Sequence, residues 1–176
     1  MRSNGLVDPN LCSNLQTNRQ AGIQPQVYLT PCFSCGNPYK QYQDLSDYME
    51  GCLGSYARHI EVRLVVEGLE LGSKLDNQKF ISDLVQTIHD YEGSCMILTS
   101  KYDWDNIVGE DFTQLSSICW VWYVHLDNYP GFQDFVPFAG WKSPSLKQYS
   151  QNVQMCNLTV NLDYFGPLEK NIINDK

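Results

Sequence analysis

Two carboxyl groups follow apolar segments of the sequence, at positions suited to acid or base catalysis. Glu67 follows residues 60–66, which are mostly apolar and rich in β-branched side chains, and precedes a glycine. A carboxyl group at the end of a buried strand lies beside low-dielectric surroundings, which disfavour its charged form and suit a general acid. The alternative is a loop carboxylate that caps Ser73 or accepts a hydrogen bond from a nearby amide. Asp127 follows a second apolar segment and is the other candidate carboxylate at a strand end.

Aromatic residues crowd the last third of the chain. Aromatic side chains offer large apolar faces, on which the C–H faces of sugar rings stack, so they suit a carbohydrate cleft. Trp122 and Tyr123 point to opposite sides of their strand, so at most one of the two faces a cleft. The alternative for each aromatic residue is packing in the core. The set is Trp120, Trp122, Tyr123, Phe132, Phe135, Phe138, Trp141 and Tyr149.

Composition excludes several classes of protein without selecting a function. The 176 residues, 43% of them hydrophobic, suit one globular domain. A net charge of −8 argues against a nucleic-acid partner and against docking on anionic lipid. The longest apolar run, residues 118–124, is too short to span a membrane. No glycine-rich nucleotide motif and no apolar signal-peptide segment is visible. The sequence therefore predicts no nucleotide cofactor and no metal site.

The seven cysteines cannot all pair with one another, because their number is odd. Cys32 and Cys35 form a C-x-x-C motif in a loop bounded by prolines and a glycine. We expect their Cα atoms to lie within the ~7 Å that a disulfide requires. Free thiols or metal and redox chemistry are the alternatives, although the scattered histidines supply no second ligand pair. A single glycosylation triplet begins at Asn157 and fits a secreted protein.

Strand and helix patterns alternate along the chain. We expect helices over residues 9–20, 41–49 (with a possible continuation to 57), 76–92 and around 104, where Asp76 caps the third. Strands are expected over residues 27–29, 60–66, 95–99, 118–125, 146–149 and 158–162. Strands separated by helices imply parallel pairing, in an open doubly wound sheet or in a barrel. We expect one domain over residues 1–166 and a polar tail over 167–176.

Several stretches resemble the family 25 glycoside hydrolases, the lysozymes that cleave peptidoglycan between muramic acid and glucosamine. The most specific are WVWYVHLDNYPGF at residues 120–132 and PFAGWKSPSLKQYS at residues 137–150. The branch that the chain resembles is found in nematodes and amoebae. The resemblance implies an irregular (β/α) TIM-like barrel with its cleft at the C-terminal strand ends. It also implies bacterial peptidoglycan as the partner, no cofactor, and a secreted or lysosomal (phagosomal) location.

The chain departs from the family at positions that the resemblance places in the cleft. The match begins after two family strands, so we expect an incomplete barrel with exposed edges at residues 27–29 and around 160, and self-association. The family's Asp-x-Glu pair is Val65, Val66 and Glu67 here, so only the proposed acid remains. Leu98 stands where a tyrosine is usual, and Asn161 and Asp163 exchange the acid and amide of the last strand.

Two functions follow from the resemblance. The first is a muramidase with Glu67 as acid, its activity impaired because the loss of one preorganised charge costs on the order of 3 kcal/mol. The alternative is a non-catalytic or truncated relative that binds glycan. In either case the substrate-binding candidates are Trp122, Tyr123, Asp127 and Trp141.

Overall fold

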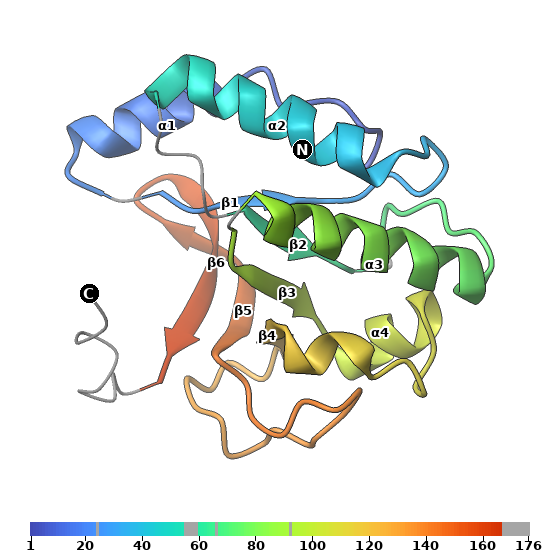
Figure 1. Cartoon of the computed structure of the whole chain (residues 1–176). Coiled ribbons are helices and arrows are strands. Elements are labelled where there is room, and N and C mark those ends of the chain that lie inside the picture. The colour runs from blue at the N-terminus through green and yellow to red at the C-terminus, as the bar shows by residue number, and fades with distance from the viewer. Residues whose placement is uncertain (24, 55–59, 66, 92, 167–176) are drawn as a thin grey trace, which may run out of the picture.

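The computed structural model describes residues 1–23, 25–54, 60–65, 67–91 and 93–166. Figure 1 shows a curved sheet with helices on one side of it. The helices are α1 (Leu11–Gln20), α2 (Pro38–Leu53), α3 (Lys74–Asp90), α4 (Lys101–Ile107) and the 3-10 helix η1 (Gln114–Ser117). The strands are β1 (Val27–Leu29), β2 (Ile60–Arg63), β3 (Cys95–Thr99), β4 (Cys119–Val124), β5 (Leu146–Met155) and β6 (Leu158–Phe165). The predicted tail, residues 167–176, lies outside the described residues.

The sheet keeps the order of the sequence, β1-β2-β3-β4-β5-β6. The first five strands pair in parallel, as predicted. A doubly wound sheet reverses its strand order at a switch point, and this order has no reversal, so the architecture is that of an incomplete TIM-like barrel. β6 pairs antiparallel with β5, contrary to the general expectation of parallel strands. The reason is that no helix separates these two strands, which are also longer than predicted and form a hairpin.

Local residue chemistry sets the helix boundaries. Pro38 occupies the first turn of α2, and Asn37 caps that helix by accepting a hydrogen bond from the Lys40 amide. The predicted continuation of α2 beyond Gly54 falls on residues 55–59, outside the described residues. Ser73, rather than Asp76, caps α3: its hydroxyl accepts from the Asp76 amide and donates to the Asp76 carboxylate. Ser73 is therefore not capped by Glu67.

Alternate strand residues divide the sheet into a helix-covered face and an inner face. Leu29, Val62, Ile97 and Val121 are register partners on successive strands, and all are buried in the core beside the helices. The residues between them point to the opposite, inner face. On that face Tyr28 is 50% exposed and Trp120 is 57% exposed. The inner face thus presents aromatic side chains to solvent, as an incomplete barrel requires.

The two outer strands are β1 and β6, as predicted. The edge of β1 is partly covered by Met1, whose amino group donates to the Tyr28 carbonyl and whose carbonyl accepts from the Thr30 amide. This is the hydrogen-bond pattern of one parallel bridge opposite Leu29. Met1 is itself buried. Self-association through these edges stays a prediction.

Three disulfides join Cys12 to Cys52, Cys32 to Cys35, and Cys95 to Cys119. The Cα atoms of Cys32 and Cys35 lie 5.3 Å apart, which confirms the prediction for the C-x-x-C motif. The first bridge ties α1 to α2, and the third ties β3 to β4. The remaining cysteine, Cys156, is exposed. No helix in the described parts of the chain is long and apolar enough to cross a membrane.

Candidate active site

Glu67 lies four residues beyond the end of β2. The strand stops at Arg63, although the Leu64 amide still donates to the Leu98 carbonyl at 2.8 Å. The chain then turns at Gly68, whose φ is 80°. Glu67 is exposed. The expectation that apolar walls enclose this carboxyl group is therefore wrong, because the chain leaves the sheet before it reaches residue 67.

Trp122 is the member of the aromatic pair that faces the inner side of the sheet. It stands between its register partners Leu98 on β3 and Leu146 on β5. Its indole N–H donates to Oδ1 of Asp163 on β6 at 3.1 Å. Burial raises the pKa of Asp163 above its ordinary value, although hydrogen bonds from Trp122 and Gln148 act in the opposite direction. Trp122 and Asp163 thus form an aromatic and carboxyl pair on the inner face.

The other altered family positions lie at different depths. Val65 is half-buried and Leu98 is 3% exposed, so both present apolar side chains. Asn161 is exposed, and its side-chain oxygen accepts a hydrogen bond from the Asn152 amide in the projecting hairpin. Asp163 lies two residues farther along β6, on the same side of the strand and about 7 Å away. The exchange of acid and amide therefore moves the carboxyl group along the strand.

Tyr123 and Trp141 lie on the helix-covered face. Tyr123 is 9% exposed and packs edge-on against Phe135. Burial, with the adjacent Asp134, raises the pKa of Tyr123 to about 12. Trp141 is 5% exposed, donates its indole N–H to the Cys119 carbonyl at 2.8 Å, and packs against Trp104. The structure does not bring these two residues together with Trp122, and their substrate-binding role stays a prediction.

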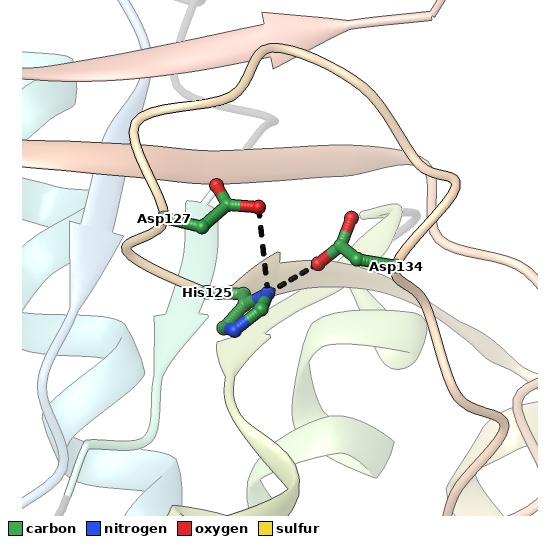
Figure 2. A group of neighbouring side chains, drawn as sticks. All are labelled: His125, Asp127 and Asp134. Atoms are coloured by element: carbon green, nitrogen blue, oxygen red, sulfur yellow. Dashed lines mark hydrogen bonds and ion pairs between the residues drawn. The ribbon is translucent and has the colours of Figure 1, made fainter.

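Asp127 belongs to a charged cluster in the loop after β4. Figure 2 shows His125, Asp127 and Asp134 converging there: His125 Nδ1 hydrogen-bonds Asp134 and lies 3.7 Å from Asp127. The ammonium group of Lys147, whose side chain is fully buried, donates to Asp127 at 2.8 Å and to Asp134 at 2.9 Å. The three ligand atoms lie within 4.8 Å of one another, as a metal site would need. Because the ammonium group of Lys147 already bonds both carboxylates, the cluster is an ion-pair network that holds the loop.

Electrostatics within this cluster favour the charged forms. Burial alone would lower the pKa of Lys147, but hydrogen bonds from its ammonium group to Asp127 and Asp134, together with their charges, outweigh it and raise that pKa. The hydrogen bond from Lys147 lowers the pKa of Asp127. Burial acts to raise the pKa of Asp134, but the bonds from Lys147 and His125 bring it below its ordinary value. Asp127 is therefore a fixed, ionised group at the rim of the strand ends.

A hollow of about 390 Å³ lies at the open edge of the sheet, beside α1 and β1. Tyr28, Thr30 and Arg63 line it, together with Met1 and Asp8. Glu67, Trp122 and Asp163 do not border this hollow. The sequence placed Trp120 among the clustered aromatic residues and Asp163 among the altered family positions, but predicted neither as a catalytic or substrate-binding residue. The signal that could have found them is the two-residue alternation, which puts Trp120 on the face of Trp122 and Asp163 on the face of Phe165, the register partner of Leu146.

Comparisons with known proteins agree with this architecture. The family model described as lysozyme-like protein 1 matches residues 1–149. Probable GH family 25 lysozyme 2 of Dictyostelium discoideum is 34% identical over 163 residues, covering 92% of this chain and 74% of that protein. Lysozyme-like protein 2 of Caenorhabditis elegans is 28% identical, covering 93% and 61%. The muramidase structure from Acremonium alcalophilum superposes with a TM-score of 0.70 at 16% identity, covering 92% and 77%.

The sheet is curled and mostly parallel, with helices on one side, and it ends in an antiparallel hairpin. This architecture defines a partial barrel of the type seen in muramidases. The chain belongs to the lysozyme-like family of GH25-type proteins. The resemblance seen in the sequence is thus confirmed at the level of family and fold.

Proposed function

We propose that this chain is a lysozyme-type glycoside hydrolase that acts on the peptidoglycan of bacterial cell walls. The observation that carries the proposal is the inner sheet face, which presents the exposed Trp120 and the half-buried Trp122 as surfaces for sugars, with the Asp163 carboxyl group bonded to Trp122. Family membership supplies the reaction class. Glu67, in the exposed turn that follows β2, would take part in proton transfer.

The site departs from an ordinary two-carboxylate site at Val65. A valine places no negative charge beside the positive charge that develops at the sugar in the transition state. Removing one preorganised electrostatic partner costs on the order of 3 kcal/mol, about a hundredfold in rate. We therefore propose that turnover is slow, with peptidoglycan still bound.

Three disulfides support a secreted or lysosomal (phagosomal) location, because disulfides persist in oxidising compartments.

A second candidate function, glycan binding without hydrolysis, is favoured by the apolar side chains of Val65 and Leu98. The binding candidates would then act without a catalytic partner: Trp122 on the inner face and Asp127 at the rim, with Tyr123 and Trp141 packed behind the sheet.

Clearing of a bacterial cell-wall suspension between about pH 4 and pH 7 tests hydrolysis. We expect slow clearing by the natural chain, about a hundredfold faster clearing by Val65→Asp, and none by Glu67→Gln. Glu70→Gln is the matched control, since Glu70 is an exposed carboxylate three residues away that accepts a hydrogen bond from Ser34. Wall binding without clearing by any variant would favour the binding function.

A further inference from the structure

We infer that Asp163 is the second carboxyl group of the site and donates the proton to the departing glycosidic oxygen. The inference rests on the proposed glycosidase function. In this step the Asp163 carboxyl proton moves to the glycosidic oxygen as its bond to the anomeric carbon breaks. Water adds to that carbon and gives its proton to a second carboxylate, for which Glu67 is the candidate. Exchange with solvent returns both groups to their starting forms.

The geometry of Asp163 suits this role better than that of Asp127. Asp163 is half-buried, stands opposite Gln148 in the sheet, and accepts from the indole of Trp122 at 3.1 Å. The carboxyl group of Asp163 thus lies at the edge of the Trp122 ring, beside the face on which a sugar would stack. Asp127 is instead held ionised by Lys147, which excludes it as a proton donor.

The environment of Asp163 favours the form that a glycosidase acid needs. Such enzymes use one protonated and one ionised carboxyl group. Burial favours the protonated form of Asp163. The position is also two residues from the family's last-strand acid, where Asn161 now bonds the hairpin backbone. The carboxyl group has therefore moved along β6 instead of being lost.

The test measures kcat/KM against pH on a soluble peptidoglycan fragment. Asp163→Asn should lower kcat/KM at least about a hundredfold, the range of general acid catalysis. Trp122→Phe keeps the ring but removes the N–H whose hydrogen bond lowers the pKa of Asp163. In that variant the loss of activity on the alkaline side should move to higher pH, an effect that a structural role of Asp163 would not produce. Gln154→Ala, at an exposed position of β5 in the projecting hairpin, is the control and should leave the profile unchanged.

Each outcome separates the two proposals. Turnover by Asp163→Asn within about threefold of the natural chain, or an unmoved alkaline limb in Trp122→Phe, overturns the role of Asp163 while leaving the hydrolase function standing. A natural chain with no turnover at any pH overturns the hydrolase function and, with it, proton donation by Asp163. A cooperative melt of each variant shows that its fold is intact.

A second inference comes from the tip of the β5–β6 hairpin. Met155 and Leu158 close a two-residue turn formed by Cys156 and Asn157, whose φ angles are 51° and 64°. Asparagine tolerates this left-handed conformation, which two-residue hairpin turns favour. Asn157 is exposed, and Thr159 two residues on completes the chain's single N-x-S/T triplet. The disulfides indicate a compartment in which such triplets are modified.

We propose that Asn157 carries an N-linked glycan. Its amide nitrogen would bond to the first sugar of an oligosaccharide carried on a lipid diphosphate, which leaves as the amide loses a proton. Secreted expression in a eukaryotic host, followed by mass spectrometry, tests this. We expect a form about 2 kDa heavier than the 20.2 kDa chain. Peptide N-glycosidase should remove the added mass and leave an aspartate at position 157.

Variants of the triplet give the control for this modification. Asn157→Gln and Thr159→Ala should abolish the added mass, whereas Thr159→Ser should keep it, because serine preserves the hydroxyl. A folded, secreted natural chain at its unmodified mass would refute the proposal. Neither result bears on hydrolysis.

Discussion

Cys95 and Cys119 are direct register partners on the adjacent parallel strands β3 and β4, and a disulfide joins them across the ladder. Their Cα atoms lie 4.7 Å apart, and 24 positions along the chain separate them. The bridge thus closes the segment that contains α4 and η1. It fixes the register of the strand that carries Trp122.

The first prediction concerns this bridge. Replacing both Cys95 and Cys119 with alanine should lower the free energy of unfolding by about 3 kcal/mol, the value for a closed loop of this length. Denaturant titration under non-reducing conditions measures it. Cys156→Ser, which alters the exposed cysteine, should change the free energy by less than about 0.5 kcal/mol. Equal effects from both changes would show that the bridge does not stabilise the fold.

The second prediction concerns Lys147. Lys147→Met leaves Asp127 and Asp134 without their shared cation and should lower the free energy of unfolding by about 3 kcal/mol near neutral pH. Both carboxylates have folded pKa values below the ordinary 3.8, so their stabilisation is present above about pH 3.8 and is lost as pH falls through the folded values. The variant should show a smaller loss of stability in acid than the natural chain.

Thermal melts from acid to neutral pH measure this dependence. Lys79→Met is the matched control, because Lys79 forms an exposed pair with Asp83 and its side chain is 76% exposed. Exposed pairs contribute little, so this change should stay within about 0.5 kcal/mol. Equal losses of stability in Lys147→Met and Lys79→Met would show that the buried ion pairs of Lys147 contribute no more than an exposed pair.

The third prediction concerns Glu61 on the inner face of β2. Burial raises the pKa of Glu61 to about 7 from an ordinary 4.5. Glu61 ionises at lower pH in the unfolded chain, so its contribution to stability is largest below about pH 4.5 and falls as pH rises to about 7, by no more than about 3 kcal/mol. Glu61→Gln should remove this fall. Thermal melts of both chains at about pH 4.5 and about pH 7 measure the fall. A pH dependence that is unchanged in the variant would contradict the raised pKa of Glu61.

The fourth prediction concerns self-association. The edge of β1 and the exposed Tyr28 beside it should pair with a second copy, giving larger species as concentration rises. Tyr28→Lys should reduce this association, because an edge lysine opposes pairing. Tyr102→Lys, at a 72% exposed position on α4, is the control. Sedimentation velocity over a concentration series measures the effect, and a monomer throughout would show that Met1 protects the edge.

The sequence predicted the parallel order of strands and the C-x-x-C bridge because both depend on local patterns. Alternation also predicted that only one of Trp122 and Tyr123 could face a cleft, but not which one. Which of the two faces the inner side depends on how β4 packs against its neighbours, and this packing buries Tyr123 in the core. The burial of Lys147 had no signal in the sequence, since lysine is rarely buried and its partners lie 13 and 20 residues away. The Cys12–Cys52 pairing was likewise hidden, because spacing does not specify connectivity.

The bridge between Met1 and β1 has a practical consequence for handling this protein. The nitrogen of Met1 is used as a main-chain donor to the Tyr28 carbonyl. Any segment ahead of Met1, a purification tag included, starts its path along the strand edge, beside the hollow lined by Tyr28 and Arg63. A tag at this position lies against the edge of the sheet. Tagged and untagged preparations therefore differ at the sheet edge in any measurement of binding or assembly.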